Sequence, residues 1–122
     1  MKIRVYYEDT DLSGFVYHSN YLNFCERARS EIFFQKGLSP IKSDSHFVVS
    51  KVEANFIKPA KFQDILEIKT EVLNIKNVSI QLLQTIWKED KKIFEMKIIL
   101  AHLKSEKTSK IDEVIKNIFL DI

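Results

Sequence analysis

Residues 8–22 read E-D-T-D-L-S-G-F-V-Y-H-S-N-Y-L, where a strand-like pattern gives way to a helical one. Two aspartates one residue apart, followed by a serine and a glycine, are compatible with the start of a calcium-binding loop. Such a loop also needs a bidentate glutamate at its twelfth position and a helix in front of it. The twelfth position here is Asn20, and the preceding residues alternate like a strand. The pattern therefore favours a turn that carries a carboxylate just before a helix.

A helix is expected directly after this stretch because apolar residues recur at helical spacing. Ser19 or Asn20 can cap its start by accepting a hydrogen bond from an early amide. Gly37, followed by Pro40, supplies a stop. The residues that would share one buried face are Tyr21, Phe24, Cys25, Ala28 and Ile32. We predict one helix of about four turns.

Outside this helix the apolar residues alternate with a period of two, which is typical of half-buried strands. A short strand is expected over residues 3–8, before the quoted stretch. Four further strands are expected after the helix, at residues 48–56, 66–72, 78–86 and 94–100. Turns are expected at 74–77 and 89–91, and a short amphipathic helix at 111–122. The order β-α-β-β-β-β defines an α+β domain over residues 1–122, and its last strands should be antiparallel neighbours.

Composition indicates an ordinary globular domain. The chain has 122 residues, of which 45% are hydrophobic and 30% charged, and no apolar run reaches bilayer-spanning length. The first residues carry no hydrophobic signal region, so a cytoplasmic protein without a transmembrane segment is expected. The 19 basic and 17 acidic residues leave a net charge of +2, which is too balanced to predict nucleic-acid binding. One helix covers only one face of the sheet, so we expect at least a dimer.

Some side chains that are capable of acid–base or nucleophilic chemistry are interpreted as structural. Asp9 is expected to be a turn residue that accepts hydrogen bonds from nearby backbone amides. Glu26 and Arg29 stand at i, i+3 on the helix and are expected to form an ion pair. Cys25, the single cysteine, lies on the apolar helical face and is expected in the core. A single cysteine also excludes an internal disulfide and a multi-cysteine zinc site.

The sequence closely resembles one known family over nearly its whole length. The similarity is carried by residues 6–22 and 26–29 (E-R-A-R), 47–49 (F-V-V), 56–60 (F-I-K-P-A) and 64–68 (D-I-L-E-I). These resemble the hotdog-fold acyl-CoA thioesterases of the 4-hydroxybenzoyl-CoA thioesterase type, in particular the YbgC-like branch associated with tol-pal operons. The resemblance implies an antiparallel sheet wrapped around one long helix, and hydrolysis of an acyl-CoA thioester to a free acid and CoA. It also implies a homodimer or a dimer of dimers, no metal, and no cofactor other than the CoA of the substrate.

The resemblance implies that Asp11 is the catalytic carboxylate, acting as nucleophile or as general base. It also implies that the backbone amide of His18 binds the oxyanion, a role that suits the free amides and positive dipole at a helix start. The His18 ring is a further candidate to orient Asp11, a water or the thioester. The Tyr7 hydroxyl is a candidate for contacting Asp11 or substrate, although its place in the alternating pattern also fits core packing. Gly14 lets the loop turn tightly.

Binding residues are expected outside this loop. The family's acyl pocket is lined partly by the partner chain, and the matching segment here is His46, Phe47 and Val48. In relatives an arginine in the turn before the next-to-last long strand would contact the CoA phosphates, and the matching residue here is Lys76. Lysine keeps the positive charge but lacks the planar guanidinium that can bind a phosphate through two hydrogen bonds. Lys104 and Lys107 are further phosphate candidates. Relatives often have two glycines after the second aspartate, where this chain has Leu12-Ser13-Gly14, so its loop is expected to be tighter or more apolar.

Other functions compatible with this fold remain open at this point. A non-catalytic hotdog module would hold acyl-CoA or acyl carrier protein, a further candidate partner, without turnover. A hydratase or dehydratase would need a histidine on the long helix, and residues 20–36 contain none. The tol-pal association suggests a third alternative, a scaffold in an envelope complex. Acyl-chain length does not follow from the sequence.

Overall fold

The computed structural model describes all residues, 1–122. In chain order, the elements are β1 (Lys2–Arg4), a single 3-10 turn (Tyr7–Asp9), α1 (His18–Phe34), β2 (Ser45–Phe56), β3 (Ile65–Ile75), β4 (Ser79–Lys88), β5 (Lys91–Lys104), β6 (Lys107–Thr108) and α2 (Glu113–Leu120). The structure therefore confirms the predicted long helix (α1), the last three predicted strands (β3, β4 and β5) and the short final helix (α2). The small strand β6 was not predicted.

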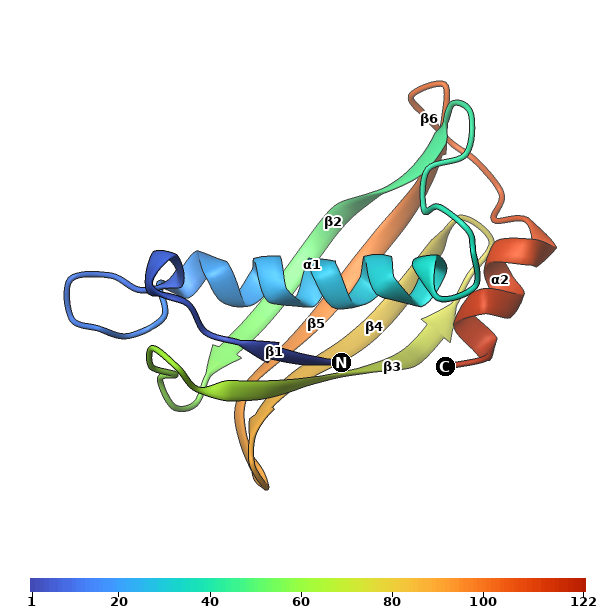
Figure 1. The fold of residues 1–122 in the computed structure, drawn as a ribbon. Coiled ribbons are helices and arrows are strands. Elements are labelled where there is room, and N and C mark those ends of the chain that lie inside the picture. Colours follow the sequence, from blue (N-terminus) through green and yellow to red (C-terminus); the bar gives the residue numbers. More distant parts are fainter.

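The strands form one antiparallel sheet in the order β1-β3-β4-β5-β2, with β6 paired to the end of β5. The hairpins β3-β4 and β4-β5 turn over at residues 76–78 and 89–90, close to the predicted turns. The sheet curls around α1, which crosses it (Figure 1). One long helix held in a curled antiparallel sheet is the hotdog fold, as the sequence predicted.

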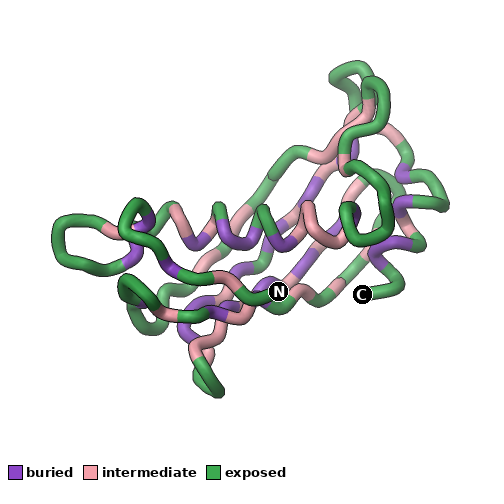
Figure 2. The backbone as a smooth tube through the Cα atoms, in the orientation of Figure 1, coloured by how far each residue is buried: buried purple, intermediate pink, exposed green.

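The core lies between α1 and the concave face of the sheet (Figure 2). The buried residues of α1 are Tyr21, Phe24, Cys25, Ala28 and Phe33. They follow the helical spacing that predicted this face, except that Phe33 is buried where Ile32 was expected and Ile32 is half-buried. Strands β4 and β5 contribute alternate side chains that are almost fully buried, including Leu82, Phe94 and Ile98. Cys25 is fully buried, as predicted.

The predicted first strand is too long. Pairing of β1 ends at Arg4, and the chain turns because the Asp9 carboxylate accepts a hydrogen bond from the Tyr6 amide at 2.9 Å. Asp9 therefore has the predicted turn role. Because the turn removes Tyr7 from the alternating pattern, the expectation of core packing for Tyr7 is wrong. Its side chain is 79% exposed, whereas Val5 is fully buried.

Two expectations for α1 are also wrong. The helix is flanked at its start by Tyr17, which provides no side-chain cap, so neither Ser19 nor Asn20 is the capping residue. Glu26 and Arg29 form no ion pair: the Glu26 carboxylate accepts from the Ser30 hydroxyl at 2.8 Å, and Arg29 donates to Gln84 on β4 at 2.9 Å. Arg29 therefore binds Gln84, a distant residue across the core, and not Glu26, its neighbour on the helix.

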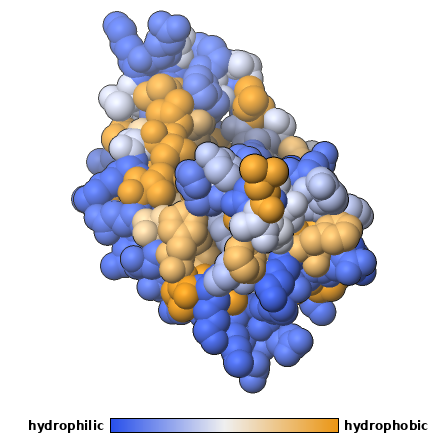
Figure 3. Space-filling model, turned by 90° about the vertical axis from the view of Figure 1, so that its left-hand side faces the viewer, coloured by the Kyte–Doolittle hydropathy of each residue, from blue (hydrophilic) through white to orange (hydrophobic).

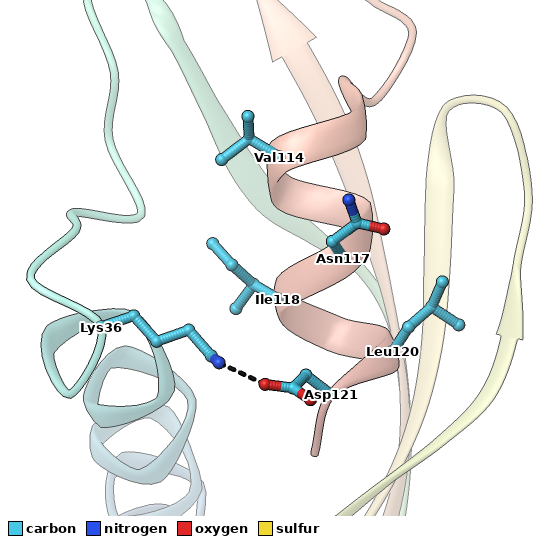
Figure 4. Close-up of a pocket in the computed structure, with 6 residues that line it drawn as sticks. All are labelled: Lys36, Val114, Asn117, Ile118, Leu120 and Asp121. Carbon is cyan, nitrogen blue, oxygen red and sulfur yellow. Dashed lines mark hydrogen bonds and ion pairs between the residues drawn. The ribbon is translucent and has the colours of Figure 1, made fainter.

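The short helix α2 packs across the end of α1. The Asp112 carboxylate caps it by accepting from the Ile115 amide at 2.9 Å. Figure 4 shows Lys36, just beyond α1, paired with Asp121 at the end of α2. Ile115, Ile118 and Phe119 extend the core at this end. Neither helix of the structure has the length and apolar character that crossing a bilayer requires.

Candidate active site

Hydrogen bonds hold the loop that carries Asp11 against the start of α1 and against Ala60. The Asp9 carbonyl accepts from the Tyr17 amide at 2.9 Å and from the Asn20 side-chain amide at 3.0 Å. The Val16 amide donates to the Ala60 carbonyl at 2.9 Å. Because both ends of the loop are fixed to the fold, the position of Asp11 relative to the helix start is set by the framework.

A tight turn places Asp11 at the tip of this loop. The Gly14 amide donates to the Asp11 carbonyl at 3.0 Å, and the Asp11 amide donates to the Phe15 carbonyl at 2.9 Å. Gly14 has φ +83°, and apart from its own chain neighbours no residue has an atom within 4 Å of where its Cβ would be. Glycine is therefore needed here for its backbone conformation and not for space.

The Asp11 carboxylate is exposed and partly held by its own turn. Its Oδ1 accepts from the Ser13 amide at 2.9 Å and also from the Ser13 hydroxyl. These hydrogen bonds, first the one from the Ser13 hydroxyl, lower the pKa of Asp11 below its ordinary value. The backbone amide of Phe15 lowers this pKa further, but no donor of the chain makes a hydrogen bond of normal geometry to the other oxygen, Oδ2. Asp11 is thus an oriented, ionised carboxylate with one free oxygen.

An open hollow of about 580 Å³ adjoins this carboxylate and is lined by Tyr7, Thr10, Asp11, Leu12, Gly14 and Phe62. The Tyr7 and Phe62 rings meet edge to face with centroids 6.1 Å apart. Leu12 and Phe62 expose apolar surface here. Figure 3, which views this end of the molecule, shows apolar side chains gathered on it. The structure therefore brings Tyr7 and Asp11 together at one apolar-edged hollow.

The first turn of α1 offers backbone donors beside the loop. The first amides of an α-helix have no acceptor inside the helix, and the amides of His18 and Ser19 donate to no loop carbonyl either. The exposed His18 ring lies against Tyr17, with centroids 4.4 Å apart, and edge-on to Phe56 at 6.5 Å. His18 is not among the residues that line the Asp11 hollow.

The expected binding residues lie elsewhere in the chain. His46 and Phe47 line a second hollow between α1 and β2, and Val48 is 36% exposed outside it. Lys76 is exposed in the β3-β4 turn, and Lys104 and Lys107 are exposed in the β5-β6 hairpin. Figure 1 shows that these two turns lie away from the loop that carries Asp11. A single chain thus does not bring these residues to the Asp11 hollow.

The buried polar contact between Gln84 and Arg29 was not predicted from the sequence. Gln84 is fully buried, and its amide nitrogen donates to the Cys25 carbonyl at 2.9 Å and to the Thr70 hydroxyl at 3.1 Å. The sequence did contain a signal for this contact: Gln84 falls in the alternating series of Ile80, Leu82 and Ile86, on the face of the strand predicted to be buried. A polar side chain on such a face needs a hydrogen-bond partner. No three His, Cys, Asp or Glu side chains cluster closely enough to hold a metal ion.

The fold and this loop define a hotdog domain that presents a carboxylate on the loop leading into its long helix. Residues 13–95 match the family model of the thioesterase superfamily. The chain belongs to this superfamily. The matched segment begins two residues after Asp11, so the family match itself does not include that carboxylate.

Individual relatives agree with this assignment. The acyl-CoA thioesterase YbgC of Helicobacter pylori is 46% identical over 87 residues, which are 71% of this chain and 65% of that protein. The match thus spans less than two thirds of the relative's length. The crystal structure of a probable thioesterase from Bartonella henselae superposes with a TM-score of 0.86 and 32% identity, covering 92% of this chain and 97% of that one. A hypothetical protein from Aquifex aeolicus superposes with a TM-score of 0.92 at 23% identity, over 98% of this chain and 97% of its own, which shows the shared fold.

Proposed function

We propose that the protein hydrolyses acyl-CoA thioesters to a free carboxylic acid and CoA, with Asp11 as its catalytic carboxylate. The observation that carries this proposal is the free Oδ2 of an ionised Asp11, at an open hollow on the loop that leads into α1, whose first amides donate to no loop carbonyl. The similarity to proteins named acyl-CoA thioesterases supports the choice of substrate.

The reaction needs two kinds of group at the thioester carbonyl. A nucleophile adds to the carbonyl carbon, and negative charge develops on the carbonyl oxygen. Fixed amide donors lower the barrier where that charge forms, and the His18 amide is our candidate for this role. Collapse of the intermediate releases the CoA thiol, and water supplies the oxygen and protons that complete the acid and the thiol.

Asp11 serves either of two routes with the same free oxygen. It attacks the carbonyl carbon to form an acyl anhydride that water then opens, or it removes a proton from a water that attacks directly. A single turnover in ¹⁸O-labelled water separates these routes. The anhydride route can leave the label in Asp11 when water attacks at the aspartyl carbonyl. Direct attack by water places the label only in the released acid.

A second copy of the chain is proposed to complete the site. Strand β2 lies at one edge of the sheet, is 12 residues long, and exposes Val48, Val49 and Phe56. An unpaired edge of this length is a template for another strand. Pairing through β2 would give the Asp11 hollow a new neighbour, and the partner's residues 46–48 are the proposed acyl-pocket wall. Pairing through β2 gives a dimer, whereas a dimer of dimers needs a further contact, and light scattering distinguishes the two.

The proposed binding roles of the lysines can be tested on the assembled protein. Lys76, Lys104 and Lys107 are free of ion pairs within the chain and are candidates for the CoA phosphates. Replacing a phosphate-contacting lysine by alanine should raise KM for acyl-CoA and leave kcat nearly unchanged, because the contact is equally strong before and during the reaction. A short acyl thioester that lacks the phosphates serves as the control substrate.

The decisive experiment measures thiol release from acyl-CoA thioesters of graded chain length, aliphatic and aromatic. We expect turnover by the parent protein, loss of turnover in Asp11→Asn, and parent-like rates in Asp121→Asn. Asp121 is a matched control because it is also an exposed aspartate with a lowered pKa, held by Lys36. Binding of acyl-CoA without thiol release from any member of the panel would overturn the proposal in favour of a non-catalytic acyl-binding module.

A further inference from the structure

The second hollow, between α1 and β2, contains a cation without an anionic partner. Arg29 makes one hydrogen bond in the chain, from Nη1 to the Gln84 side-chain oxygen at 2.9 Å. It belongs to none of the five ion pairs. Burial lowers the pKa of its guanidinium below the ordinary arginine value, since moving a charge out of water disfavours the charged form. Because the bond to Gln84 is the only hydrogen bond of the Arg29 side chain, its remaining N–H groups have no acceptor from the protein.

The guanidinium is held in place by a buried support. Gln84 is fully buried and is itself fixed by two donations, to the Cys25 carbonyl and to the Thr70 hydroxyl. With its amide nitrogen used in this way, its oxygen must face Arg29. An arginine that is oriented before a ligand arrives loses little conformational freedom on binding. The support therefore makes Arg29 a preorganised donor.

The walls of this hollow are mostly apolar. Its volume is about 310 Å³, which lies at the lower end of the range for small-molecule sites, about 300–1,000 Å³. Arg29 and Glu26 line it from α1. The apolar residues that line it are Phe33, Ile41, Phe47, Val49, Leu100 and Phe119. Glu26 is turned to Ser30 at 2.8 Å, so its charge stays near the hollow without neutralising Arg29.

We propose that this hollow binds an apolar carboxylic acid, with the carboxylate on Arg29 and the hydrocarbon part against the aromatic and aliphatic walls. A carboxylate matches the planar fork of a guanidinium and can accept two parallel hydrogen bonds from it. Besides Arg29, the polar and charged lining residues are Glu26, Ser30 and His46. A ligand with a single negative charge and a hydrophobic body suits Arg29 and the apolar walls. His46 and Phe47, which the proposed function places at the acyl pocket, also line this hollow. The inference therefore rests on that proposed function for its place in the assembled protein, whereas binding of the acid itself requires no chemistry at Asp11.

Calorimetric titration of the intact protein with octanoate, octanol and octylammonium tests the proposal. We expect the parent to bind octanoate at least about tenfold more tightly than octanol, the ratio expected for a hydrogen bond to a charged group. Octylammonium should bind more weakly than either. Arg29→Gln should bind octanoate and octanol alike, because its neutral amide can still donate to Gln84 but carries no charge. Equal affinity of the parent for octanoate and octanol, or an unchanged preference in Arg29→Gln, would overturn the proposal.

A second variant, Glu26→Gln, is expected to strengthen octanoate binding and leaves the contact between Gln84 and Arg29 in place. Glu26 is exposed, so Glu26→Gln should fold as the parent does and remove a negative charge beside the ligand. Octanoate should then bind about twofold to fivefold more tightly, as for a surface charge pair, and octanol should bind as before. Octanoate affinity that stays the same or falls in Glu26→Gln contradicts the proposal even if Arg29→Gln does not fold. Octanoate binding needs no turnover, so a protein that shows these affinities but releases no thiol from acyl-CoA would separate this proposal from the proposed catalysis.

Discussion

The hydroxyl of Tyr21 fixes the segment to which the Asp11 loop is attached. It accepts a hydrogen bond from the Ala60 amide at 2.9 Å, and the Ala60 carbonyl accepts from Val16 in the loop. Ala60 is fully buried and Tyr21 is 4% exposed. Tyr21→Phe keeps the ring, which stacks on Phe94 with centroids 5.2 Å apart. The substitution therefore removes one acceptor and leaves a buried N–H that water cannot reach.

An unsatisfied buried donor costs about 1–3 kcal/mol. For 122 residues, an unfolding entropy of about 2.1 cal/mol/K per residue makes each kcal/mol worth about 4 °C in Tm. We therefore expect Tyr21→Phe to lower the free energy of unfolding by about 1–3 kcal/mol and Tm by about 4–12 °C. Urea denaturation and thermal melting at neutral pH measure both quantities.

Tyr17→Phe is the matched control because the Tyr17 side chain is 47% exposed and its hydroxyl makes no hydrogen bond within the chain. It should change stability by less than about 0.5 kcal/mol. Burial raises the pKa of Tyr21 above its ordinary value of 10.0. The unfolded chain then ionises first, so the stability that Tyr21 contributes is present below that value and is lost as the pH rises through the folded pKa. The difference between parent and Tyr21→Phe should therefore shrink in alkali. Equal stability of the two phenylalanine variants at neutral pH would refute this reasoning.

Three further predictions concern buried and site residues. Gln84→Leu should lower the free energy of unfolding by about 1–3 kcal/mol, because it removes the hydrogen bonds between Gln84 and the Cys25 carbonyl, the Thr70 hydroxyl and the Arg29 side chain. Urea denaturation should show no such loss for Gln81→Leu, a half-exposed glutamine on the same strand. Ser13→Ala should raise the pKa of Asp11 and move the acid limb of kcat/KM to higher pH, since its hydrogen bonds favour the ionised form; superimposable pH profiles would contradict this. Burial raises the pKa of Cys25 to about 12, so a thiol reagent should label it only on unfolding, and rapid labelling of the native protein would contradict the core position.

The sequence predicted the fold well where one periodic pattern dominates. The helical spacing from Tyr21 to Ala28 and the alternation from Val78 to Leu100 correspond to α1 and to the paired strands β4 and β5. These patterns are reliable because burial of one face decides them. The first strand failed because a single side-chain bond, from the Tyr6 amide to Asp9, overrides the alternation. Local hydrogen bonds of this kind leave no periodic trace in a sequence.

The candidate site was predictable in part. The loop string pointed to Asp11, and the structure puts it with Tyr7 at one hollow. The sequence did not predict that Ser13 occupies one carboxylate oxygen and leaves the other free, because this depends on the turn geometry. It also assigned Arg29 a local partner on α1, whereas the fold brings Gln84 to it from 55 residues away. Contacts between distant segments follow from sheet order, which the strand pattern alone does not determine.

The proposed mechanism requires that the Asp11 carboxylate carries out the chemical step. Its most direct test is a single-turnover measurement of thiol release, with acyl-CoA affinity measured separately, on the parent and on Asp11→Asn. We predict that Asp11→Asn binds acyl-CoA as tightly as the parent and releases thiol at least about a hundredfold more slowly, the usual contribution of a positioned acid–base group. A variant that binds substrate and releases thiol at the parent rate would contradict the mechanism.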